Sequence, residues 1–204
     1  MTVLVTDIAE IQIGYQGRGR LEYDPAGDVC LLQMRDLEDD GRVRDASRLL
    51  RVATEGEPLE RYGVRDGDVV FQARGSRNRA FVLRGVPPST LASNHFYILR
   101  MRSDIMLPPF LAWALNQSPA QAHLGGMTQG TTTMLVPKEA FTTLAVAVPT
   151  LDIQRAIVQL AALREKETQT VQNLERKRDI LLRALCMRAA GWTEPERSRT
   201  WRKK

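Results

Sequence analysis

A stretch of 37 residues, from Asp152 to Arg188, contains neither glycine nor proline. Such a stretch can form one uninterrupted helix, which at 1.5 Å per residue would be about 55 Å long. Residues along it recur at alternating spacings of 4 and 3, as the apolar seam of a coiled coil does. The apolar members of this seam, which we predict to be the dimerisation residues, are Ile153, Ile157, Leu160, Val171, Leu174, Leu181 and Leu185.

A helix of this length outruns one small domain, so its seam needs a second long helix beside it. The polar seam positions Arg164, Glu167 and Arg178 could set the pairing and its register. The rest of the chain offers no second stretch of comparable length. We therefore expect the helix to pair with another copy of the chain or with a partner subunit. The alternative is a single helix that lies along its own domain.

The remaining composition is that of a soluble globular protein, with 43% hydrophobic and 26% charged residues in 204. The two cysteines, Cys30 and Cys186, are too few for a disulfide framework and fit a reducing cytosol. No apolar run approaches the roughly 20 residues that span a bilayer. The N-terminus lacks the features of a signal peptide. We therefore expect a cytoplasmic protein without a membrane partner.

The first 150 residues read as a mixture of short strands and short helices. Apolar runs predict strands at 29–34, 69–74, 80–83, 96–101 and 144–149, with a hairpin turn at 77–79. Pro108 opens a short predicted helix through Leu115, and a second follows from Ser118 to Leu124. We predict an α+β fold in three parts: a globular mixed α/β domain over 1–150, the long helix over 151–189 and a basic tail over 190–204.

Positive charge gathers in two places. Residues 152–204 hold 13 basic and 7 acidic residues. Between Asp68 and Asp104 there is no acidic residue at all. That gap contains the arginines Arg74, Arg77, Arg79, Arg84, Arg100 and Arg102. A local excess of this size indicates a polyanionic partner, and arginine suits phosphate and the guanine edge. A plain solvated surface is the alternative.

The sequence offers no catalytic constellation. His95 and His123 have no Cys, Asp or Glu nearby at metal-site spacing, so a zinc site is poorly supported. The glycine-rich segment from Gly14 to Gly19 lacks the context of a nucleotide-binding loop. The Glu-x-Lys at Glu175 to Lys177 has no upstream carboxylates on a strand. Beside a basic stretch and a pairing helix, this indicates a binding subunit and not an enzyme.

Several segments together resemble the specificity (S) subunit of Type I restriction–modification enzymes. They are Leu32 to Leu37 followed by Asp39-Asp40-Gly41, Val64 to Gly75, Ala92 to Arg100, Phe110 to Gln117, Gly130-Thr131-Thr132, and Leu144 to Pro149 with Leu151, Gln154 and Ile157. Each motif alone is weak, but their order and spacing are more specific. The resemblance covers nearly the whole chain up to about Leu185.

The resemblance implies a target recognition domain followed by a spacer helix. It implies as partners double-stranded DNA, methyltransferase (M) subunits and, in a restricting complex, restriction (R) subunits. This chain would need no cofactor, since S-adenosylmethionine would bind to the methyltransferase. Family subunits usually carry two recognition domains and two spacer helices, whereas this sequence has one of each. It therefore resembles a half-subunit that forms a homodimer or pairs with another half-subunit.

We predict that three segments of the recognition domain contact DNA, where side chains would read base edges while phosphate contacts set the register. The predicted residues are Arg18, Arg20, Arg74, Arg77, Asn78, Arg79, Gln129, Thr131 and Thr132. Two copies paired antiparallel would read an inverted repeat, one half-site each. The alternatives are a coiled-coil scaffold or regulatory protein that no longer reads DNA, and an enzyme such as a nuclease, which the missing carboxylate cluster disfavours.

Overall fold

The computed structural model describes residues 1–17, 23–54, 59–75, 78–128 and 134–192. Its strands are β1 Thr2–Leu4, β2 Ala9–Ile13, β3 Val29–Leu32, β4 Leu50–Val52, β5 Gly63–Val64, β6 Val69–Gln72, β7 Ala80–Val82, β8 Thr90–Ala92, β9 Phe96–Met101 and β10 Ala145–Ala147. Its helices are α1 Val5–Ile8, α2 Pro108–Leu115, α3 Ser118–Gly126 and α4 Leu151–Ala189, with short 3-10 turns at η1 Met34–Asp36, η2 Ala46–Arg48, η3 Glu60–Tyr62 and η4 Lys138–Phe141. The chain forms two units, Met1–Val158 and Gln159–Lys204.

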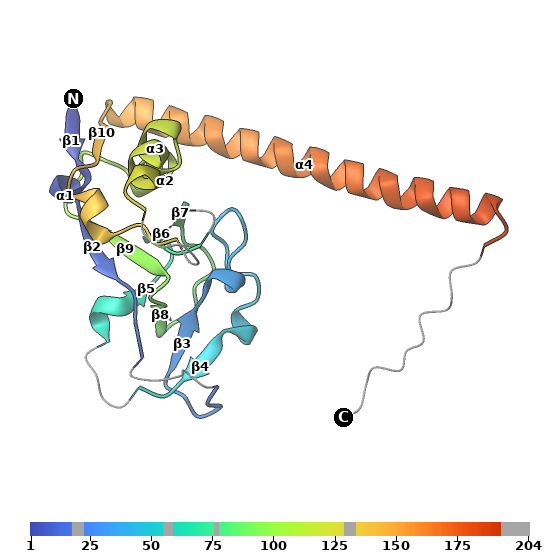
Figure 1. Ribbon diagram of the computed structural model, residues 1–204, viewed down its shortest axis with the longest axis horizontal. Coiled ribbons are helices and arrows are strands. Elements are labelled where there is room, and N and C mark those ends of the chain that lie inside the picture. Colours follow the sequence, from blue (N-terminus) through green and yellow to red (C-terminus); the bar gives the residue numbers. More distant parts are fainter. Residues whose placement is uncertain (18–22, 55–58, 76–77, 129–133, 193–204) are drawn as a thin grey trace. The chain divides into compact units, whose positions relative to one another are not determined.

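The centre of the first unit is an antiparallel sheet in the order β2-β9-β6-β7 (Figure 1). Its middle strands are apolar at successive positions because both faces are covered. Tyr97 and Leu99 of β9 pack in one cluster with α2, α3 and η4, whereas Phe96 and Ile98 pack in another against the second sheet. Continuous apolar runs are typical of strands buried on both sides. The edge-to-face contact of Phe71 with Phe141, at 5.1 Å between ring centroids, lies in the first cluster.

A second sheet, in the order β4-β3-β8-β5, covers the other face of the first. Strands β3 and β8 are parallel and the other pairs are antiparallel. A two-stranded pair, β1 with β10, brings the beginning of the domain next to the segment that leads into α4. The turn from β8 to β9 carries the chain from the second sheet into the first, so this turn sits where the two sheets meet.

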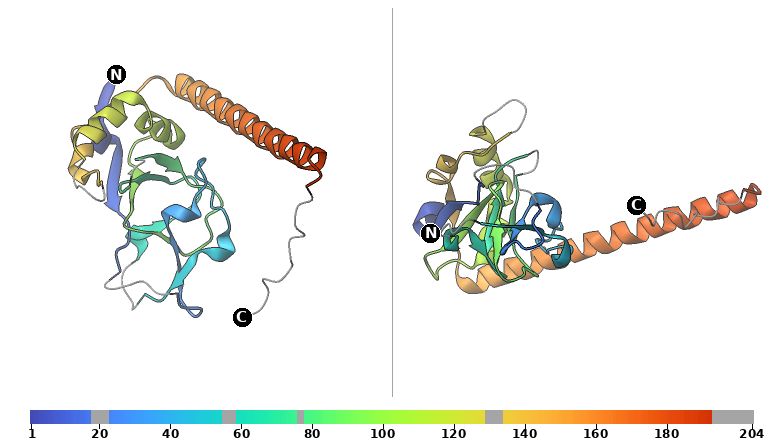
Figure 2. Two further views of the ribbon diagram at one scale, coloured as in Figure 1. Left: turned by 45° about the vertical axis from the view of Figure 1, so that its right-hand side comes forward. Right: turned by 90° about the horizontal axis from the view of Figure 1, so that it is seen from below.

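The long helix is a single continuous element of 39 residues in each view of Figure 2. Its first two turns belong to the globular unit, because Ile157 and Val158 pack against the apolar cluster that includes residues of α2. Gln154 is fully buried there. From Gln159 to Trp192 the helix and the residues after it form part of the second unit, where most side chains are exposed.

The predicted fold class is confirmed: a mixed α/β domain is followed by one long helix. The predicted strands at 29–34, 69–74, 80–83, 96–101 and 144–149 are present as β3, β6, β7, β9 and β10, and both predicted short helices are present. The sequence did not indicate β1, α1, β4, β5 or β8, each of only two to four residues. Within the described residues, no helix is both long and apolar enough to cross a membrane.

Candidate nucleic-acid interface

Two of the three predicted DNA-contact segments are hydrogen-bonded, through described residues, to the turn from Ser93 to Phe96. Phe96 N–H donates to the Ser93 carbonyl at 3.0 Å and closes this turn. The glycine-rich segment is attached by Gly14 N–H, which donates to the Phe96 carbonyl at 2.9 Å. The loop after β6 is attached by Ala73 N–H, which donates to the His95 carbonyl at 2.8 Å. Residues far apart in the sequence therefore converge on one turn.

The third segment is attached through the second. Gly75 N–H donates to the Met134 carbonyl at 3.0 Å, and Val136 N–H donates to the Ala73 carbonyl at 2.9 Å. Arg74, between Ala73 and Gly75, forms an isolated antiparallel β-bridge with Leu135 through the backbone. The predicted residues Arg18, Arg20, Arg77, Gln129, Thr131 and Thr132 lie outside the described residues. Described residues on one side of each segment are linked: Gly14 and Ala73 bond to the Ser93–Phe96 turn, and the segment 134–136 bonds to the loop after β6.

The backbone of the glycine-rich segment passes so close to Ser93 that position 14 requires glycine. A Cβ atom built on Gly14 would lie 2.1 Å from the Ser93 carbonyl oxygen, well inside contact distance. Only glycine lets the backbone pass this close to another strand. Tyr15, the next residue, is buried and its N–H donates to the Ala92 carbonyl at 2.7 Å. The position of the segment is therefore fixed by backbone contacts up to the start of the glycine-rich loop.

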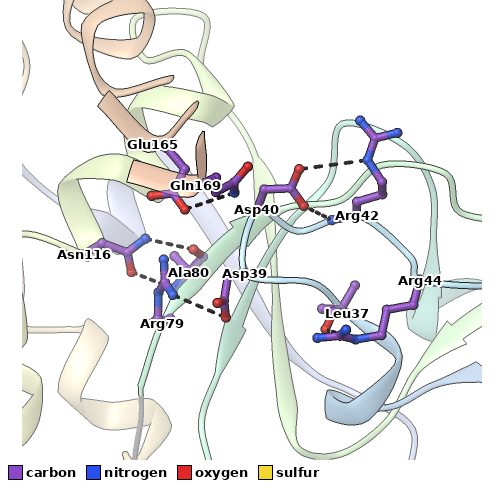
Figure 3. A network of polar contacts seen from close by, with 10 residues as sticks. All are labelled: Leu37, Asp39, Asp40, Arg42, Arg44, Arg79, Ala80, Asn116, Glu165 and Gln169. Carbon is purple, nitrogen blue, oxygen red and sulfur yellow. Dashed lines mark hydrogen bonds and ion pairs between the residues drawn. The ribbon is translucent and has the colours of Figure 1, made fainter. Parts of the chain in front are cut away.

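Asn78 and Arg79 are held at the end of the β6–β7 hairpin. Asn78 Nδ2 donates to the Gln72 carbonyl at 3.1 Å, so this amide is already engaged in the turn. The next residue, Ala80, is fastened to the helical layer: Ala80 N–H donates to Asn116 Oδ1 at 2.8 Å, and Asn116 Nδ2 donates back to the Ala80 carbonyl at 2.9 Å (Figure 3). The side chain of Asn116 thus pairs with the edge strand β7 as a neighbouring strand would.

The guanidinium of Arg79 has an acidic neighbour that the sequence does not place beside it. Arg79 Nη1 lies 3.8 Å from Asp39 Oδ1 (Figure 3). The guanidinium carbon of Arg79 lies 5.6 Å from the centre of the Phe81 ring. Asp39 is 75% exposed and Arg79 is 37% exposed. Exposed ion pairs of this kind are worth about 0–1 kcal/mol. Arg79 can therefore exchange Asp39 for another anion at little cost.

Two arginines of the basic stretch have structural partners. Arg100 Nη2 donates to the Gly63 carbonyl at 2.8 Å and to the Arg61 carbonyl at 3.2 Å, next to the 3-10 turn η3. Arg102 Nη2 pairs with Glu10 Oε2 at 2.9 Å across β9 and β2. These contacts neutralise or occupy two of the six arginines counted in the sequence. Among the described residues, Arg74 and Arg79 are the members of the stretch that belong to the converging segments.

The surroundings of His95 disfavour its charged form. Partial burial lowers the pKa of His95 below its ordinary value, and the nearby Arg74 guanidinium lowers it further. The imidazole is therefore mainly neutral at pH 7. Arg74 Nε is itself buried and has no hydrogen-bond partner among the described residues, and the same is true of Ser93 Oγ. No local sequence pattern marks His95 or Ser93 as part of a site, because their neighbours come from distant segments of the chain.

The second histidine has a local explanation. His123 Nε2 lies 3.0 Å from the Ala140 carbonyl and 3.1 Å from Thr143 Oγ1, so it links α3 to η4 and to the residues that follow η4. Among the residues that the structure describes, no group of three or more His, Cys, Asp or Glu side chains could hold a metal ion.

The predicted dimerisation residues lie on α4. Six of them are between 47% and 67% exposed: Ile153, Leu160, Val171, Leu174, Leu181 and Leu185. Ile157 instead packs against the apolar cluster of its own domain. Pairing of two such helices remains a prediction. The helix also exposes apolar side chains off the seam, at Leu163, Ile180 and Leu182.

No protein-family model matches the sequence, and no curated protein matches it. Solved structures share its fold, among them the following three. The first belongs to a study of complex assembly and conformational transition of the type I R-M system, with a TM-score of 0.67 and 17% identity over 91% of this chain. The others are the Type-I restriction-modification system S subunit from M. genitalium, with a TM-score of 0.53 and 13% identity over 88% of the chain, and the HsdS subunit from Thermoanaerobacter tengcongensis, with a TM-score of 0.55 and 19% identity over 87%.

These likenesses show the fold of this chain: it is that of Type I specificity subunits, which confirms the resemblance noted in the sequence at the level of structure. The match accounts for 39% to 43% of the length of the three solved chains. The present chain therefore spans about two fifths of the structures that it matches.

Proposed function

We propose that this chain is a sequence-specific DNA-recognition subunit of a Type I restriction–modification complex. The observation that carries the proposal is the fold, which the chain shares with specificity subunits over about nine tenths of its length. The attachment of two predicted contact segments to the Ser93 turn, and of the third to the second of them, is consistent with the proposal. Arginine and amide side chains are those that contact phosphates and base edges in DNA.

Each copy reads one half-site in this proposal. Two copies pair antiparallel along the apolar seam of α4, which places one recognition domain towards each end of the pair. A two-fold symmetric pair recognises an inverted repeat, and the length of the helix sets the distance between its half-sites. A different half-subunit can take the place of the second copy if it presents a complementary seam. The exposed leucines of α4 are the surface that favours this arrangement.

The chain itself performs no chemistry in this proposal. It docks methyltransferase subunits, which bind S-adenosylmethionine and methylate adenine after turning the base out of the duplex. In a restricting complex, restriction subunits join the same assembly. The role of the present chain is to hold the partner enzyme at the correct sequence.

The direct test is DNA binding by the purified chain, with a duplex pool of random sequence followed by selection. Arg74→Ala combined with Arg77→Ala should lower affinity by at least about tenfold, because one arginine contact to guanine is worth about 1–3 kcal/mol. It should also flatten the dependence of affinity on salt concentration, by about 0.9 in logarithmic slope for each phosphate contact that is lost.

A matched control removes the same charge elsewhere. Arg35→Ala combined with Arg65→Ala changes two side chains that are 72% and 87% exposed and lie outside the converging segments. This control should bind DNA nearly as well as the natural chain. If the natural chain has the mass of a dimer but does not bind DNA, the alternative hypothesis of a coiled-coil scaffold protein is favoured. Metal-dependent cleavage of DNA by the pure chain would favour a nuclease.

A further inference from the structure

A polar pocket of about 320 Å³ opens beside the Ser93 turn. Tyr15 and Leu31 provide apolar parts of its lining, and its polar groups come from Gln16, Gln33, Asn94 and His95. These residues belong to the end of the glycine-rich segment, to β3 and the residue after it, and to the turn between β8 and β9. The pocket therefore lies where the segments of the proposed DNA interface converge, but none of the predicted contact residues lines it.

The described lining carries no charged side chain apart from His95, whose imidazole is mainly neutral at pH 7. This composition is unsuited to a phosphate group, because sites for phosphate are built from arginine, lysine or clustered backbone N–H groups. The three primary amides of the lining, on Gln16, Gln33 and Asn94, offer both hydrogen-bond donors and acceptors. Asparagine and glutamine amides of this kind pair with the edges of nucleobases, and with adenine in particular.

A second observation concerns Ser93, which also lines the pocket. Ser93 is 4% exposed, and within the part of the chain that the structure describes its Oγ has no hydrogen-bond partner. Buried hydroxyl groups are nearly always partnered in folded proteins, and an unpartnered one costs free energy. Arg74 Nε is the other buried side-chain atom that lacks a partner among the described residues, and Arg74 is close enough to His95 to lower its pKa. Both atoms with unmet hydrogen bonds are therefore close to this turn.

We propose that the pocket is a nucleobase-binding site in which Asn94 and its neighbours recognise one base of the half-site. Tyr15 and His95 supply flat side chains at its wall, and the amides supply the hydrogen bonds. Arg74, beside the pocket, is placed to meet the phosphate of the same nucleotide. This inference rests on the proposed function and assigns base selection to a surface distinct from the arginine-rich hairpin.

The first experiment compares the sequences that each variant selects from a random duplex library. Asn94→Ala should relax the preference at one or two positions of the half-site by about tenfold, because a bidentate contact is worth about 1–3 kcal/mol of discrimination. The salt dependence of its binding should stay unchanged, since no phosphate contact is lost. Asn173→Ala, on the exposed part of α4, is the matched control and should select the same sequences as the natural chain. An unchanged preference in Asn94→Ala would overturn the proposal.

Ser93→Ala separates recognition from folding. Removal of a buried hydroxyl that has no partner should leave the stability of the DNA-free protein unchanged or raise it. If the hydroxyl completes a hydrogen bond when a base enters, the same variant should lose base preference. A Ser93→Ala variant that keeps the full preference of the natural chain would show that this hydroxyl takes no part.

The second experiment does not depend on DNA binding. Adenosine, guanosine, cytidine and thymidine are each titrated into the full chain at millimolar concentration, and the amide NMR signals of Ser93, Asn94 and His95 are followed. We expect at least one nucleoside to move these signals, and inorganic phosphate to leave them in place. Signals that move only with phosphate, or with none of the probes, would overturn the proposal even if the chain binds DNA.

Duplexes with a mismatch distinguish the two ways in which a base can reach the pocket. A mismatch lowers the cost of turning a base out of the stack. If the base enters the pocket unstacked, the mismatched duplex should bind more tightly to the natural chain and not to Asn94→Ala. If the base is read in the groove, the mismatch should bring no gain. Either result supports a nucleobase site, provided that the preference depends on Asn94.

Discussion

The side-chain carbonyl of Gln154 accepts a hydrogen bond from the backbone N–H of Leu107 at 2.8 Å, and this contact joins the first turn of α4 to the segment that precedes α2. The amide nitrogen of the same side chain, Nε2, donates to the Ile105 carbonyl at 2.7 Å and to the Pro149 carbonyl at 2.9 Å. Gln154 is fully buried. One side chain therefore fixes where the long helix begins relative to the domain from which it emerges.

Gln154→Ala should lower the free energy of unfolding by about 1–3 kcal/mol, because backbone groups that lose their partner remain largely out of water. Gln159→Ala changes the same residue type one and a half turns later, where the side chain is exposed. That control should stay within about 0.5 kcal/mol of the natural chain. Urea denaturation of both variants measures the difference, and equal midpoints would contradict the role assigned to Gln154.

Much of the fold was predictable from local patterns, and the reason is visible in β6 and β9. Val69 to Phe71 and Phe96 to Leu99 are continuous apolar runs because helices cover one face of the sheet and a second sheet covers the other. The long helix was predictable because glycine and proline are absent over a long range. Strand β8, from Thr90 to Ala92, was not predictable, since its pairing with β3 joins residues that lie 60 positions apart.

The candidate site was harder to predict than the fold. The lack of acids between Asp68 and Asp104 indicated a local excess of positive charge, yet Arg102 pairs with Glu10 and Arg79 with Asp39. Charge counts along a sequence miss such partners. The motif residues Asn116 and Gln154 carried the family resemblance, and the structure shows both as anchors of the fold. The pocket beside Ser93 forms only when three segments meet, so no local pattern reports it.

Asp39→Asn should raise the affinity of the chain for DNA several-fold at low salt. The physical reason is that Asp39 occupies the Arg79 guanidinium, for which a DNA phosphate would compete. Asp40→Asn is the matched control, because it removes the same charge from the neighbouring residue, whose partner is Arg42 (Figure 3). Fluorescence anisotropy at several salt concentrations measures both. An equal gain in DNA affinity in the two variants would show that only the change in net charge matters, and would contradict a specific role for Asp39.

Stability should fall towards acidic pH in a way that depends on His95. Its folded-state pKa is lowered, first by burial and then by Arg74, so the unfolded chain binds a proton more readily than the folded chain. The free energy of unfolding is therefore insensitive to this group above its ordinary pKa of 6.5, and it decreases as the pH falls below that value. His95→Gln should lose less stability than the natural chain between pH 7.5 and 5.5, as measured by denaturation at both values. An identical loss of stability in the two proteins would show that protonation of His95 is not the cause of the pH dependence.

Leu181→Glu should separate the two copies that we propose to pair along α4. Leu181 is a seam residue and is 59% exposed in the single chain, so a carboxylate there would be buried without a partner in the paired helices. Ile180→Glu is the matched control, because Ile180 is the adjacent residue, is 63% exposed and points away from the seam. Light scattering should give twice the 23.0 kDa chain mass for the natural protein and for Ile180→Glu, and the single mass for Leu181→Glu. A natural chain that stays at the single mass at micromolar concentration would mean that the seam binds a different protein, in which case Leu181→Glu should abolish that association and Ile180→Glu should preserve it.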